Sequence, residues 1–117
     1  MLIKFPKDDQ RYSWTNHIKG KMIQYLISES LIKRIIKSPQ RVEEGIAPQT
    51  IAAMQRTQSK KPQEVWVMYK LISQNSKLKT QNYNSKLKII STWRYPGISP
   101  VGKKIYIPED VWQELEK

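Results

Sequence analysis

The stretch from Lys86 to Pro96, which reads KLKIISTWRYP, decides the fold and gives the first indication of a partner. Apolar residues fall on both parities of this stretch, as they do in a strand that is covered on both faces. Its end brings Trp93, Arg94 and Tyr95 together. A guanidinium can hold phosphate and aromatic rings can stack bases, so the stretch predicts contact with single-stranded nucleic acid.

Three further strands are predicted before this one. Residues 64–72 are apolar on both parities and form the expected central strand, whereas residues 41–47 and 50–57 form two outer strands. The connection between the last two strands is long and polar, because the sequence NSKLK occurs at 75–79 and again at 84–88. We expect residues 74–85 to extend this hairpin as a basic arm, which either contacts a ligand or is an inert insertion.

Helical spacing marks the N-terminal part of the chain. Residues 15–27 have an apolar stripe of helical period, with Thr15 or Ser13 as the N-cap. Residues 28–38 form a second helix that ends before a proline, and a proline followed by two acids at 108–110 starts a short third one. Helices followed by strands predict an α+β domain, in which two N-terminal helices pack on one face of a mostly antiparallel four-stranded sheet.

Composition limits both the architecture and the function. A chain of 117 residues suits a single domain, here 1–117, with a core at 13–96 and a tail at 97–117 that carries the short helix. The 21 Lys and Arg against 10 Asp and Glu give a formal net charge of +11, which favours a polyanionic partner over a merely soluble basic surface. The absence of cysteine excludes disulfides, and the absence of a long apolar run excludes a membrane span, so we expect a cytoplasmic protein.

Four segments together resemble one family. They read TNHIKGKM at 15–22, ISE at 27–29, SPQRVEEG at 38–45 and KIISTWRYP at 88–96. This ordered pattern over residues 13–96 is similar to small RelE-like proteins, among which the BrnT-type toxins and their uncharacterised relatives are closest. The long hairpin and the residues after Gly97 depart from that pattern.

The resemblance implies a microbial-RNase fold and the function of a metal-independent mRNA endoribonuclease from a toxin–antitoxin system. In that reaction the 2′-hydroxyl of the RNA attacks the adjacent phosphate, which requires a base, an acid and cations. An acidic antitoxin protein would then be a second partner beside the RNA. The alternative is a non-catalytic RelE-fold module that binds nucleic acid or a protein.

The candidate residues follow from this chemistry. The catalytic candidates are His17, Lys21, Arg94 and Tyr95, and the nucleic-acid-binding candidates are Arg41, Arg56, Lys70, Lys86, Lys88 and Trp93. His17 and Lys21 share a helix face because they are four residues apart. With one histidine, no cysteine and scattered acids, we expect no metal or cofactor.

Each candidate also has a structural interpretation. A lone histidine near a helix start often packs or caps, and large aromatics such as Trp93 usually belong to a small core. Arginines on outer strands, such as Arg41, also protect sheet edges from aggregation. The two hypotheses can be separated by strand parity: an enzyme needs the even-numbered Lys70 and Arg94 on one sheet face with His17 at its rim.

Overall fold

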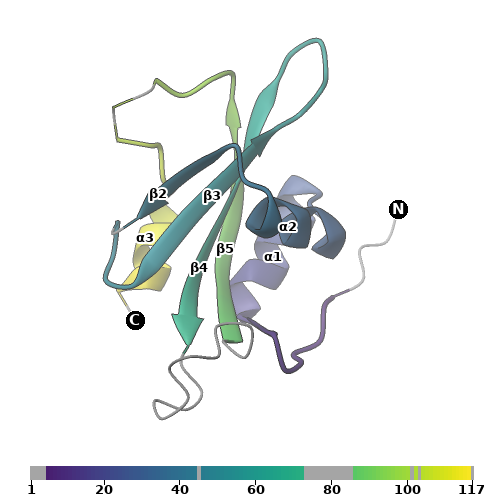
Figure 1. The fold of residues 1–117 in the computed structure, drawn as a ribbon, viewed down its shortest axis with the longest axis vertical. Helices are drawn as coiled ribbons and strands as arrows, with labels where there is room; N and C mark the ends of the chain where they lie inside the picture. Colours follow the sequence, from purple (N-terminus) through teal and green to yellow (C-terminus); the bar gives the residue numbers. More distant parts are fainter. Residues whose placement is uncertain (1–4, 45, 73–85, 101, 103, 117) are drawn as a thin grey trace.

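A computed structural model describes residues 5–44, 46–72, 86–100, 102 and 104–116. Its strands are β1 (Tyr12–Trp14), β2 (Arg41–Glu44), β3 (Thr50–Arg56), β4 (Gln63–Ile72) and β5 (Lys86–Pro96), and its helices are α1 (Asn16–Tyr25), α2 (Glu29–Lys37) and α3 (Glu109–Leu115). The strands form one sheet in the order β1-β5-β4-β3-β2 (Figure 1). The expected arm at 74–85 lies outside the described residues.

The α+β class is confirmed and the sheet is mostly antiparallel, but the predicted number of four strands is wrong, because the sheet has five. The fifth strand is β1, which pairs with β5 in parallel, so the sheet is mixed. Two acids shape this strand: the side chain of Asp9 accepts hydrogen bonds from the backbone of Arg11 and Tyr12, and that of Asp8 accepts one from the backbone of Trp14. A three-residue strand inside a charged segment gives too little alternation to be predicted from sequence.

Helices cover both faces of the sheet. Helices α1 and α2 lie on one face and α3 lies on the other (Figure 1). The core under α1 and α2 takes its strand residues from Tyr12, Trp14, Ala53, Val65, Val67, Leu87 and Ile89. The core under α3 takes Ala52, Met54, Trp66, Met68, Ile90 and Trp93. The C-terminal segment, expected to be a tail outside the core, therefore contributes to the second core through Val111 of α3 and through Ile107, which precedes the helix.

A β-bulge in β5 changes which residues share a face. Tyr69 of β4 pairs with Ile89, but the preceding Met68 pairs with Ser91, so Ile90 is an extra residue on β5. Odd-numbered residues of β5 therefore face α1 and α2 before the bulge and face α3 after it. Without such an extra residue, parity would be constant along the strand.

The start of α1 is fixed to this bulge. Thr15 is the N-cap: its hydroxyl oxygen accepts a hydrogen bond from the backbone of Ile18 at 3.0 Å. The same hydroxyl donates to the carbonyl of Ile90 at 3.0 Å and lies 3.3 Å from that of Ile89.

Among the described residues, no helix is long and apolar enough to cross a membrane.

Candidate nucleic-acid interface

The bulge places Lys70 and Arg94 on opposite faces of the sheet. Lys70 has the parity of Trp66 and Met68 and faces α3. Arg94 lies beyond the bulge and pairs with Val65, a residue of the core under α1 and α2. The parity argument from the sequence therefore fails, because it assumed a regular strand. These two cations cannot act together on one phosphate.

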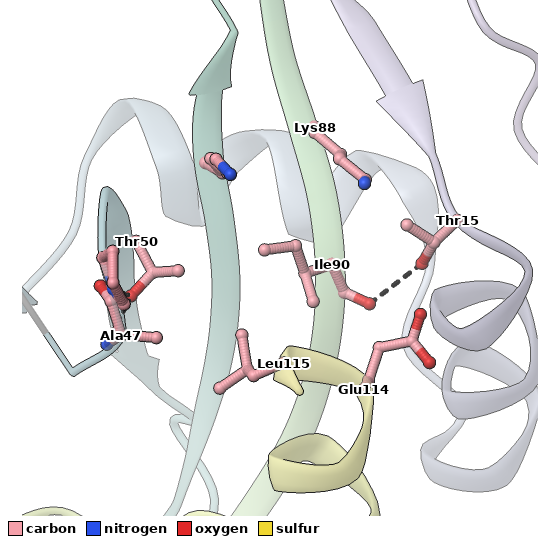
Figure 2. Close-up of a pocket in the computed structure, with 9 residues that line it drawn as sticks. Thr15, Ala47, Thr50, Lys88, Ile90, Glu114 and Leu115 are labelled. Atoms are coloured by element: carbon pink, nitrogen blue, oxygen red, sulfur yellow. Dashed lines mark hydrogen bonds between the residues drawn. The ribbon is translucent and has the colours of Figure 1, made fainter. Parts of the chain in front are cut away.

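A pocket of 230 Å³ lies on the α3 side, and Lys70 and Lys88 are its two cations. The remaining lining residues are Thr15, Ala47, Pro48, Thr50, Ile90, Glu114 and Leu115. Figure 2 shows Lys88 extending from β5 toward Thr15, with Ile90 below it and Glu114 approaching from α3. We refer to this cavity as the lysine pocket.

The two lysines are directly opposite each other on adjacent strands. Lys70 of β4 is in register with Lys88 of β5. Within the described parts of the chain, neither ammonium has an ion-pair or hydrogen-bond partner, since the ion pairs there involve other cations. Like charges directly across a strand pair destabilise a sheet. The arrangement is therefore a cost to the fold, and an anion between the lysines would reduce it.

Glu114 is the acidic residue in the lining of the lysine pocket, and it contacts His17, which is not itself a lining residue. The Oε1 atom of Glu114 lies 3.9 Å from Nδ1 of His17, and Nε2 of His17 is 2.9 Å from the hydroxyl of Ser91. The His17 side chain is 15% exposed. The carboxylate of the pocket therefore lies beside an imidazole, and these are two residue types that can transfer protons.

Lys21 has a different environment from the pocket lysines. It is 5% exposed, and its ammonium donates to Asp110 of α3 and to Gln24 at 2.9 Å, and it lies 5.0 Å from the ring centre of Tyr25. Burial alone would raise the pKa of Asp110. The hydrogen bond from Lys21, the charge of Lys21 and the nearby His17 outweigh burial, so that the pKa lies below its usual value of 3.8. Lys21 therefore joins α1 to α3 and is not presented to a ligand.

The end of β5 is structural in this fold. The Nε of Arg94 donates to the carbonyl of Tyr25 at 2.8 Å, and its Nη2 donates to the carbonyl of Leu26 at 3.2 Å. Arg94 therefore supplies hydrogen-bond donors to carbonyls at the C-terminal end of α1 that have no partner within the helix. Trp93 is fully buried and stacks on Trp66 with ring centres 6.3 Å apart, so neither of its faces is open to a base. Tyr95 packs against Tyr106, with ring centres 6.1 Å apart.

The remaining predicted nucleic-acid-binding residues differ in whether their side chains already have partners within the protein. Arg41 donates to Glu43 at 2.9 Å and to the Ser99 hydroxyl at 2.7 Å, and its side chain is 13% exposed. It therefore ties β2 to the segment that follows β5. Arg56 is exposed at the end of β3. Lys86 is half-buried two residues before Lys88 and shares its face.

Sequence reasoning missed the contribution of Glu114 to the pocket. The sequence feature that could have indicated it is the acidic character of the last ten residues, which suits a helix that packs on a basic surface.

A metal site is not supported by the residues that the structure describes, because they contain no group of three histidines or acids able to hold an ion. Comparison of the chain with protein-family models, curated proteins and solved structures gave no match.

Proposed function

We propose that this protein binds single-stranded RNA and that the lysine pocket holds a backbone phosphate. The observation that carries the proposal is the pair Lys70 and Lys88, which are opposed across two strands and form no ion pair within the described residues. Two ammonium groups in one cavity attract a phosphate, and the high net charge of +11 adds attraction at longer range. A cavity of 230 Å³ admits a phosphate and part of a sugar but not a duplex.

The hydroxyl of Thr50 fixes one side of the same cavity. It already donates to the carbonyl of Ala47 at 2.8 Å and accepts from the backbone of Ala47 at 3.0 Å, which fixes the turn before β3. The pocket is therefore rigid on the β3 side. Rigid walls reduce the ordering cost when an anion binds.

Endoribonuclease activity of the RelE-like kind is the second candidate, and the contact between Glu114 and His17 favours it. In this reaction the carboxylate of Glu114 takes the proton of the 2′-hydroxyl, whose oxygen attacks the phosphorus. Protonated His17 gives its proton to the leaving 5′-oxygen of the next nucleotide, which yields a 2′,3′-cyclic phosphate and a free 5′-hydroxyl. Lys70 and Lys88 would neutralise the charge that develops on the phosphate oxygens. An acidic antitoxin that covers these lysines is the protein partner consistent with this candidate.

Binding is tested by fluorescence anisotropy with a labelled single-stranded RNA over a series of salt concentrations. The variant is Lys70→Ala with Lys88→Ala, and the matched control is Lys60→Ala with Lys61→Ala in the exposed turn between β3 and β4. We expect the slope of log affinity against log salt to fall by about 0.7 for each pocket lysine removed, because each one releases a counterion. Equal affinities and slopes in the pocket and control variants would refute the proposal.

Cleavage is tested separately on the same RNA. Glu114→Gln keeps the shape of the side chain and removes its charge, so an endoribonuclease that uses Glu114 loses product formation while RNA affinity is retained. Growth arrest on induced expression, with total RNA examined at intervals, gives the cellular readout. Intact RNA with wild-type protein, under conditions where binding is measured, leaves a binding module and excludes this enzyme hypothesis.

A further inference from the structure

Tyr106 is an exposed aromatic side chain that the fold holds in place on the α3 side of the sheet. In the segment before α3, Ile105 and Ile107 pack in or against the core under α3. Lys104 and Tyr106 alternate with them and are exposed. The ring of Tyr106 is centred 6.1 Å from that of Tyr95, at an interplanar angle of 39°. Tyr95 in turn packs against the core under α3, so it anchors a neighbour that is 54% exposed.

Arg56 lies in the same row of the sheet as Tyr95. Arg56 of β3 pairs with Glu64 of β4, and Glu64 pairs with Tyr95 of β5. Arg56 has the parity of Met54, so its side chain faces α3, as the ring of Tyr95 does. With neighbouring strands ~4.8 Å apart, the Cα atoms of Arg56 and Tyr95 are about 10 Å apart. A cation therefore lies on the same side of the sheet as the aromatic pair, two strands away from Tyr95.

The guanidinium of Arg56 is available to a ligand. Its side chain is 41% exposed, and within the described residues its one ion-pair contact is with Glu64, whose Oε2 is 3.9 Å from Nε. The two carboxylate oxygens of Glu64 already accept hydrogen bonds, from the Trp66 indole at 3.0 Å and from the backbone of Ser99 at 2.9 Å. Glu64 is also fully buried, so its charge is not presented to a ligand. An anion at the surface therefore meets the arginine and not the carboxylate.

We propose that Tyr106 stacks one base of a single-stranded RNA, while Arg56 and Lys104 contact phosphates of the same strand. The inference rests on the proposed RNA binding and adds a base-binding element to it. Every base has a flat face that packs on an aromatic ring, so such a contact is tolerant of sequence. In a duplex these faces are occupied by neighbouring bases, which leaves the unstacked bases of a single strand as the ligands that fit. We refer to Tyr95, Tyr106 and Arg56 as the tyrosine platform.

The tyrosine platform and the lysine pocket lie on the same face of the sheet, near opposite ends of β4. Lys70 marks the level of the lysine pocket, and Glu64, the partner of Arg56, marks that of the platform six residues earlier. At ~3.3 Å per residue, the two sites are about 20 Å apart along the sheet. Single-strand-binding domains take about 4–16 nucleotides, so one RNA strand can contact both sites. The pocket then holds the backbone, and the platform distinguishes an RNA with bases from a bare phosphate chain.

The test compares two RNA probes of about twelve nucleotides by fluorescence anisotropy, one made of adenosines and one abasic with the same backbone. Wild-type protein should prefer the adenosine probe. Tyr106→Ala should lower affinity for that probe by about tenfold and leave affinity for the abasic probe unchanged, with unchanged circular dichroism. Tyr106→Phe keeps the ring and should behave as wild type. Phe5→Ala is the matched control, because Phe5 is 51% exposed and precedes β1 at the edge of the sheet.

Salt dependence separates the cations from the ring. Arg56→Gln should lower the slope of log affinity against log salt by about 0.7 on both probes, whereas Tyr106→Ala should leave the slope unchanged. An unchanged preference for adenosine in Tyr106→Ala, with weaker binding in Lys70→Ala with Lys88→Ala, overturns this inference and leaves the proposed function standing. The reverse result refutes the lysine pocket and supports the platform. A glutamate-rich peptide is the third probe, and its binding at Arg56 without a preference for adenosine would also overturn the inference.

Discussion

Lys70→Glu should make the protein more stable and a poorer ligand for RNA at the same time. In the native sheet Lys70 faces Lys88 directly, and each like-charged pair of this kind is unfavourable by about 0.2–1 kcal/mol. The substitution creates an attractive pair of similar magnitude, so the free energy of unfolding should rise by about 1 kcal/mol. For a chain of 117 residues this corresponds to a rise in Tm of about 4 °C. Position 70 is chosen because Lys88 extends from β5 toward Thr15 and the neighbouring Glu114 (Figure 2), so that Lys88 is left in place.

The assay is thermal unfolding by circular dichroism at low and high salt, with RNA anisotropy on the same samples. Lys60→Glu makes the same charge change at an exposed turn position and should leave Tm within experimental error. The gain in Tm should shrink near 1 M salt, where the Debye length is about 3 Å. An unchanged or lower Tm, or a raised Tm with full RNA affinity, would show that the two lysines do not form the repulsive anion site argued above.

Three other perturbations test the contacts around the site. Thr15→Val removes the cap of α1 and the bond to the bulge carbonyl at Ile90, so urea unfolding should show a loss of ~1–2 kcal/mol, mostly recovered by Thr15→Ser. Arg94→Ala exposes the unsatisfied carbonyls that end α1 and should lower stability by ~1–2 kcal/mol with RNA affinity nearly unchanged; a large loss of affinity would place Arg94 in the interface. The pKa of Asp110 lies below 3.8, so its pairing with Lys21 stabilises the protein above that pH and is lost as pH falls through the lowered value. Chemical unfolding from neutral pH to below 3.8 should therefore lose less stability in Lys21→Met than in wild type, and parallel curves would contradict this.

The central strands could be predicted from sequence because their composition is decisive. The stretches that became β4 and β5 are apolar on both parities, and only a strand covered on both sides needs that pattern. The capping role of Thr15 was also within reach, as one of two candidates that the spacing allowed. The apolar pattern of a strand and the N-cap of a helix both depend on residues that are close together in the sequence, and a single sequence is sufficient to predict them.

The candidate site was less predictable because it depends on one irregularity and one short strand. Nothing in the pair Ile89-Ile90 distinguishes a regular strand from a bulge, and the hydroxyl of Thr15 that bonds their carbonyls is more than seventy residues away. The three residues of β1 also gave no periodic signal. As a result, the sequence argument grouped Lys70 with Arg94, whereas the fold groups it with Lys88.

The bulge and β1 together explain why the cations are separated as they are. In a regular β5, Arg94 would share the face of Lys88, and Trp93 would turn toward α1 and α2. The extra residue Ile90 instead sends Trp93 under α3 to stack on Trp66, and it sends Arg94 to the end of α1. Because β1 ends at Trp14, the edge of β5 beyond it is left to α1, and His17 reaches Ser91 and the α3 side there. The lysine pocket, the contact of His17 with Ser91 and the structural role of Arg94 are therefore consequences of the same local geometry.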